Sequence, residues 1–207
     1  MLLLATLAFA GKFGVVKTPT ASTSPATQTG DCSRTLAMSA KGLSVCGGTA
    51  TFTYPAKGIT DLLGPWDRTW KPESEGGVPV QKYVYESLGL TVREPSDGPT
   101  GSQAVMLELT CDEQNRHGPF ADKPFAGQVT IGTPGGGQLV VSCASMESDF
   151  VPLLEASGLE HSKTDWNSYR IPLGDNEVAV GFPLEFQRPS PDADAPVSYI
   201  ELRPKKD

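Results

Sequence analysis

The predicted fold depends on GLSVCGGTATFTY, residues 42–54, and on AKGITDLLG, residues 56–64, which follows it. In residues 42–54, apolar side chains alternate with polar ones on both sides of a glycine pair, which is the pattern of a β-hairpin. In residues 56–64, three apolar residues have helical spacing, and a glycine followed by a proline ends the run. The two segments therefore predict a pair of strands and a short helix.

The same order of elements recurs in the second half of the chain. After residue 64 the pattern predicts further elements in this order: strands 82–86, 89–93 and 104–109, a hairpin 127–132 and 138–143, a helix 146–156, and strands 169–173, 177–182 and 197–203. We therefore predict an α+β fold of two tandem β-β-α-β-β-β units, residues 41–118 and 119–207. In each unit a short helix would pack on an antiparallel sheet.

The composition narrows the class of fold and of function. The chain has 207 residues, among them 22 glycines and 18 prolines, and so many helix breakers disfavour a bundle of long helices. Its 17 basic residues are scattered among 24 acidic ones, for a net charge of -7. Because binding to phosphate groups needs concentrated positive charge, no nucleic-acid partner is expected.

The N-terminus has the features of an export segment. Residues 1–10 are apolar except for one threonine, and they end in Ala8-Phe9-Ala10, the small-x-small form of a signal-peptidase site. We interpret residues 1–16 as an export signal or a membrane anchor, and residues 17–40 as a flexible tether. The protein is therefore expected in the periplasm or elsewhere in the cell envelope.

The four cysteines are Cys32, Cys46, Cys111 and Cys143. They show no C-x-x-C spacing and the chain has only two histidines, so no metal site is expected. An even number of cysteines in an exported chain indicates two disulfides. Of the three connectivities we favour Cys32–Cys46 and Cys111–Cys143, because the repeated element order brings those segments together. The alternative interpretation is buried free thiols.

The residue inventory argues against an enzyme. The chain has no P-loop, nucleophile elbow, metalloprotease helix or dinucleotide motif. A serine or cysteine nucleophile would need a histidine base, and His117 and His161 both lie in polar segments. A glycosidase would need two carboxylates, such as Glu86 and Glu108, but carboxylates on water-facing strands are far commoner than catalytic pairs. We therefore expect no catalytic residues and no cofactor.

All three tryptophans follow the two predicted helices. Trp66 and Trp70 come after the first helix and Trp166 after the second, and tryptophan is enriched at binding hot spots. The acidic residues beside them, Asp67 and Asp165, would attract a basic partner and speed its association. We predict that these five residues bind a partner protein. The alternative is that the tryptophans are buried beneath loops and the acidic residues are only solvated.

The segments DLLGPWDR, residues 61–68, and YVYESLGL, residues 83–90, carry a resemblance. They resemble small bacterial domains of exported lipoproteins and of immunity proteins in interbacterial toxin systems. The order of elements is also similar to that of outer-membrane assembly lipoproteins of the small-protein-A type and of the tandem units of the β-lactamase inhibitory protein. The resemblance covers residues 42–110, and residues 127–203 by element order only. The second half has Gly158-Leu159-Glu160-His161 in place of the Pro-x-Asp-Arg part.

The resemblance implies a binding function without catalysis. The chain is therefore expected to be an exported protein that blocks a partner protein, specifically an immunity protein that neutralises a basic-surfaced toxin or effector in the cell envelope. The first alternative is an envelope scaffold or assembly factor. A hydrolase of the envelope is the alternative from another functional class.

Overall fold

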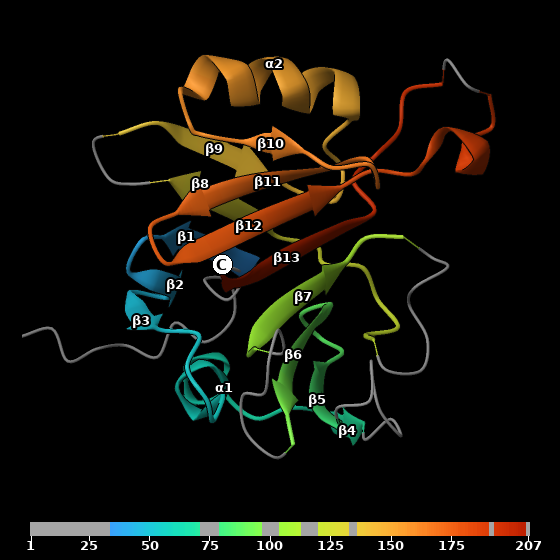
Figure 1. Ribbon diagram of the computed structural model, residues 1–207. Helices are drawn as coiled ribbons and strands as arrows, with labels where there is room; N and C mark the ends of the chain where they lie inside the picture. Colours follow the sequence, from blue (N-terminus) through green and yellow to red (C-terminus); the bar gives the residue numbers. More distant parts are fainter. Residues whose placement is uncertain are drawn as a thin grey trace, which may run out of the picture.

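The computed structural model describes residues 34–70, 79–96, 104–112, 120–132, 136–190 and 193–205, which contain thirteen strands in two sheets (Figure 1). The five-stranded sheet has the order β3 (Gly48–Ala50), β2 (Gly42–Val45), β1 (Thr35–Ser39), β8 (Gln128–Gly132) and β9 (Gln138–Val141). The eight-stranded sheet has the order β10 (Ser162–Lys163), β11 (Ser168–Leu173), β12 (Asn176–Gly181), β13 (Tyr199–Pro204), β7 (Met106–Thr110), β6 (Leu90–Pro95), β5 (Val80–Tyr85) and β4 (Arg68–Trp70).

Each sheet takes strands from both halves of the chain. In the five-stranded sheet β1 pairs with β8 in parallel, and in the eight-stranded sheet β7 pairs with β13 antiparallel. Every other pairing within the two sheets is antiparallel between strands that are neighbours in the sequence. The two long-range pairings therefore join the halves of the chain into one structure.

The predicted α+β fold of two tandem units is wrong. Strands outweigh helices in the molecule, and most of the predicted elements form near their expected positions. They assemble differently, because the hairpin strands of both halves share one sheet and the strands after the helices share the other. Alternation along a strand shows which side chains face the same way, but it leaves open which strand lies beside it.

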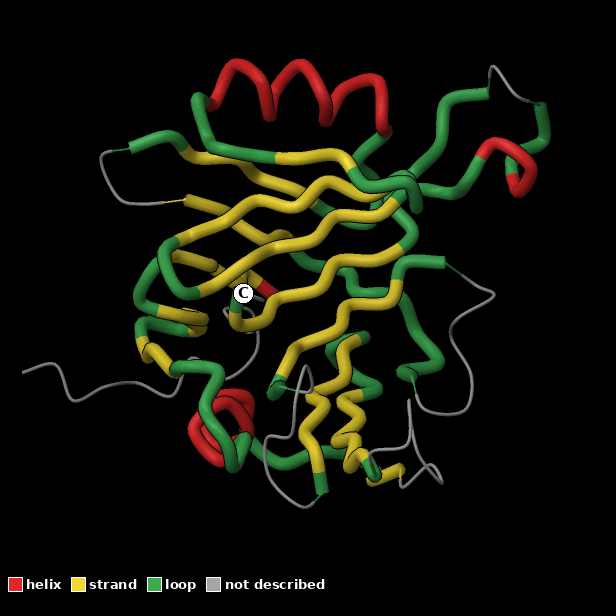
Figure 2. The backbone as a smooth tube through the Cα atoms, in the orientation of Figure 1, coloured by secondary structure: helices red, strands yellow, loops and turns green. Residues whose placement is uncertain are grey.

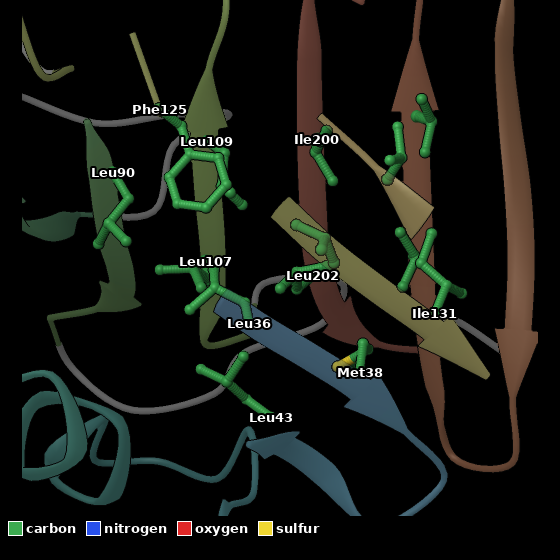
Figure 3. Close-up of a cluster of buried hydrophobic side chains, with 14 of the residues drawn as sticks. Leu36, Met38, Leu43, Leu90, Leu107, Leu109, Phe125, Ile131, Ile200 and Leu202 are labelled. Atoms are coloured by element: carbon green, nitrogen blue, oxygen red, sulfur yellow. The ribbon is translucent and has the colours of Figure 1, made fainter. Parts of the chain in front are cut away.

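The core fills the space between the two sheets. Leu36 and Met38 of β1 and Ile131 of β8 belong to one cluster with Leu107 of β7 and Leu202 of β13, and all five side chains are fully buried (Figure 3). Two sheets packed face to face bury alternate residues of each strand. Strand β1 lies within residues 17–40, which the sequence analysis places in the tether, so the end of that segment contributes directly to the core.

The two helices connect the sheets at opposite ends of the molecule (Figure 2). Helix α1 (Lys57–Leu63) runs between β3 and β4, contacts β2 and β3, and buries Ile59. Helix α2 (Glu147–Ser157) runs between β9 and β10, contacts β9, and buries Phe150 and Leu154. Leu153 has the helical spacing of a core residue beside Phe150 and Leu154, but it is 56% exposed and does not share their buried face.

A disulfide joins Cys111, which follows β7, to Cys143, which follows β9. This confirms the predicted pairing of those two cysteines and links the eight-stranded sheet to the five-stranded sheet. Cys46 is also disulfide-bonded, and Cys32, its predicted partner, lies outside the described residues. The predicted export segment, residues 1–16, also lies outside them. Within the described ranges no helix has the length and apolar character needed to cross a bilayer.

Candidate partner-binding surface

The predicted binding residues fall into two groups at opposite edges of the eight-stranded sheet. Trp66, Asp67 and Trp70 lie in or next to edge strand β4, whereas Asp165 and Trp166 follow edge strand β10 (Figure 1). The structure therefore does not bring the three tryptophans together. Each group has to be considered as a separate surface.

In the group at β4, Trp66 and Asp67 make contacts within the protein, whereas Trp70 is 40% exposed. The ring centroid of Trp66 lies 4.8 Å from that of Tyr83, and Trp66 is 44% exposed. The Asp67 carboxylate accepts a hydrogen bond of 2.7 Å from the backbone N–H of Glu86, and the side chain of Glu86 pairs with Arg68 at 2.7 Å. These contacts hold the turn that follows β5. The aspartate and arginine of the quoted DLLGPWDR segment thus have a structural role here.

The local structure also explains why the YVYESLGL segment has a glycine at position 89. Gly89 lies in the turn between β5 and β6 with φ of +72°, a conformation that favours glycine. A side chain at this position would meet the backbone of Pro124 and Phe125 at 2.5 Å. The Leu-Gly-Leu sequence is therefore explained by a tight turn against a crossing segment.

A groove of about 880 Å³ lies at the other edge, between the start of α2, residues 163–165 with Asn167, and residues 184–186, 188 and 193–194. Glu147, the first residue of α2, is one of the charged residues that line this groove. Lys163 lies 3.5 Å from one oxygen of the Glu147 carboxylate, and Arg188 donates a hydrogen bond to the other. Although burial disfavours the charged form of Lys163, its contact with Tyr169 and the attraction of Glu147 raise the pKa of the ammonium above its usual value.

The wall of the groove opposite α2 is a loop that joins β12 to β13 and carries the 3-10 turn Glu185–Gln187. Arg188 ties the two ends of this loop together, because it donates hydrogen bonds of 3.1 Å to the carbonyls of both Pro183 and Ala193. Asn167 donates a further bond of 3.2 Å to the Pro183 carbonyl. The loop is therefore held to itself, to α2 and to the segment after β10.

The N-terminus of α2 is attached to the segment that precedes β13. The Asp194 carboxylate accepts hydrogen bonds from the Ser148 hydroxyl and from the Ser148 backbone N–H, the latter at 3.1 Å. These bonds favour the ionised form and lower the pKa of Asp194. Asp194 thus satisfies an N–H group that the helix itself leaves without a partner.

Three large apolar side chains are exposed at this end of the molecule: Phe186 lines the groove, Trp166 stands in the chain between groove-lining Asp165 and Asn167, and Leu153 follows groove-lining Pro152. Leu153 on α2 is 56% exposed, Trp166 73% and Phe186 on the loop 82%. Asp165 and Glu185 precede the two aromatic residues, and both line the groove. Sequence reasoning identified Asp165 and Trp166 but missed Leu153, which has core-like helical spacing, and Phe186. Phe186 could have been identified in the sequence as an aromatic residue within a proline-rich polar segment between two strands.

The carboxylates considered for hydrolysis both have basic partners. Glu86 pairs with Arg68 and accepts a hydrogen bond of 2.6 Å from the backbone N–H of Asp122. Glu108 lies 3.9 Å from the ammonium of Lys82 and 3.7 Å from the guanidinium of Arg93. His161 is exposed, with its Nδ1 3.0 Å from the carbonyl of Leu159, and His117 lies outside the described residues. Within the described ranges no three metal-ligating side chains are grouped as a metal site would require.

No protein-family model, curated protein or solved structure matches the chain.

Proposed function

We propose that this protein is an exported binding protein that blocks a partner protein by covering part of the partner's surface. The observation that carries the proposal is the exposure of Phe186, which lines the groove, together with that of Trp166 and Leu153, which adjoin groove-lining residues along the chain. Protein interfaces have apolar and aromatic anchors at their centre and charged residues around them. The groove end of this molecule has that composition.

The groove end supports the proposal better than the β4 end does. The hollow beside Trp66 is smaller, about 530 Å³, and Trp66 itself packs against Tyr83. Trp166 is far more exposed, and the neighbouring loop is already held in place by Arg188. A pre-ordered surface loses less conformational entropy when it binds.

The proposal includes two more specific claims: that the protein is exported, and that its partner lies in the cell envelope. Disulfides persist in oxidising compartments, so the Cys111–Cys143 bridge supports a location outside the cytoplasm. The net charge of -7 favours a basic-surfaced partner. Together with the resemblance to immunity proteins, this leads us to propose a toxin of the periplasm or cell envelope as the partner.

The proposal is tested by isolating the full chain, with an affinity tag, from the envelope fraction of the cells that produce it. A partner bound in stoichiometric amount is then purified, and its dissociation constant is measured by calorimetry. Trp166→Ala should weaken binding at least about tenfold, without changing urea unfolding, because it removes an exposed anchor. Trp70→Ala, which changes the same residue type at the other edge of the sheet, is the matched control and should leave the affinity within about threefold.

Two results would contradict the proposal. One is the absence of any stoichiometric partner, and the other is an affinity that falls with Trp70→Ala but not with Trp166→Ala. The toxin hypothesis needs a separate assay, in which the purified protein has to suppress the toxicity of the partner toward susceptible cells. If the partner is not toxic, the immunity role is excluded, whereas the binding function still holds.

A further inference from the structure

Phe186 is the most exposed large apolar side chain in the described part of the chain, at 82%. It lies in the turn Glu185–Gln187, on the loop between β12 and β13, which extends away from the sheets (Figure 1). A single exposed apolar residue is common on protein surfaces and carries no argument by itself. Phe186 differs from such a residue in how its loop is held and in the charges beside its ring.

The loop is braced on both sides of Phe186. Arg188 bonds the carbonyls of Pro183 and Ala193, so one side chain closes the loop across its base, and its third contact, to Glu147, fixes the loop against α2. Inside the loop, the backbone N–H of Leu184 donates a bond of 2.9 Å to the side-chain oxygen of Gln187. The ring of Phe186 is therefore presented to solvent on an ordered support.

The charges of the groove favour a basic group in the partner. The Glu147 carboxylate is already paired with Lys163 and Arg188, so it adds little attraction for a basic group of the partner. Asp165 and Glu185 line the same groove, and neither has a basic partner among the described residues. The surface around Phe186 thus combines an aromatic ring with two carboxylates that are available to an approaching molecule.

We propose that Phe186 is the anchor residue of this surface: its ring enters an apolar depression on the partner protein, beside a lysine or arginine that faces Glu185 and Asp165. The inference rests on the proposed binding function and adds the residue and the kind of partner surface that make the contact. Arg188 is a positioning residue, since it acts by holding the loop that carries Phe186. Because hydrogen bonds already hold residues 183–188, which carry Phe186, less conformational entropy is lost on binding.

The contact is tested by photo-cross-linking from within the protein. The probe is p-benzoylphenylalanine, placed at position 186, 166 or 153 of the full chain in the producing cells. We expect an adduct from position 186 whose cross-linked residue, mapped by mass spectrometry, is apolar and next to a basic residue of the partner. Adducts from positions 166 or 153 without one from 186, or a 186 adduct on a polar surface without such a depression, would overturn the anchor role. No adduct from any of the three positions would overturn the proposed function as well.

Affinity for the cross-linked partner then tests the anchor and its support. Phe186→Ala should weaken binding at least about 30-fold, as expected of a hot-spot aromatic residue, with unchanged urea unfolding. Arg188→Ala should also weaken binding, and the double variant should bind no more weakly than Phe186→Ala alone, because Arg188 acts through Phe186. Losses that simply multiply in the double variant, or an unchanged affinity of Phe186→Ala, would refute the proposal. Urea unfolding of Arg188→Ala separates a loss of fold from a loss of positioning.

Discussion

The attachment of α2 to the body of the protein depends on Phe150, and its removal gives a prediction of known size. The side chain is 1% exposed, and its ring centroid lies 5.7 Å from that of Tyr169 and 5.5 Å from that of Phe182. A buried phenylalanine changed to alanine costs about 3 to 5 kcal/mol of stability, and the two aromatic contacts contribute to that cost. We expect Phe150→Ala to lower the free energy of unfolding by about 4 kcal/mol.

The same helix offers a matched control. Leu153 is one turn away on α2 and 56% exposed, so Leu153→Ala should change stability by no more than about 0.5 kcal/mol. Both variants are measured by urea unfolding at pH 7, with circular dichroism as the signal. For a protein of this length a loss of 4 kcal/mol lowers the melting temperature by about 8 to 16 °C.

Two outcomes would contradict the prediction for Phe150→Ala. A loss below about 1 kcal/mol for Phe150→Ala, or equal losses for both variants, would mean that the buried face of α2 is assigned incorrectly. In that case the groove, which is built on the start of this helix, would have to be reconsidered. A change in the slope of the unfolding curve would indicate that the unfolded state has changed as well.

Two further predictions concern the disulfide and the start of α2. The Cys111–Cys143 bridge closes a segment with a sequence separation of 32, so replacing both cysteines by serine should cost about 4 kcal/mol by the loop-entropy relation; a loss below about 1 kcal/mol in urea unfolding would contradict it. Hydrogen bonds lower the pKa of Asp194, so its carboxylate stabilises the fold above the unfolded pKa of about 3.9 and loses that contribution as the pH falls through the lower folded value. The stability difference between the wild type and Asp194→Ala should therefore be constant above about pH 5 and narrow below pH 4, and a difference that persists unchanged to pH 2 would contradict this origin.

Several local features could be predicted from the sequence because they depend on neighbouring residues. The glycine after α2, Gly158, has the left-handed conformation that ends the helix where the sequence analysis expects it to end. The alternation in residues 42–54 similarly predicts a pair of strands, and β2 pairs with β3, although β3 begins within the glycine pair, at Gly48, and ends at Ala50. Cys111 and Cys143 were assigned to each other because the repeated element order was expected to bring their segments together; the disulfide forms between them, although the two-unit fold does not.

Only some residues of the proposed binding surface were predicted from the sequence. Trp166 and Asp165 were selected as an exposed aromatic residue with an acidic neighbour, and both lie at the groove end. Phe186 and Leu153 were missed, because helical spacing or sequence context alone cannot show whether an apolar side chain finds a neighbour to cover it. Exposure is a property of the packed molecule, and it was decided by which strands and loops surround each residue.

The local elements follow from neighbouring residues: where strands alternate, where helices end, and which residues form turns. Which strands lie side by side depends instead on the packing of the whole molecule, which places β1 beside β8 and β7 beside β13, so that the two halves of the chain share both sheets. The physical reason is that a period-two pattern specifies the buried face of a strand but not its neighbour. The choice of neighbour comes from long-range packing of the core between the sheets, and that choice also separates Trp66 and Trp70 from Trp166 at opposite edges of one sheet.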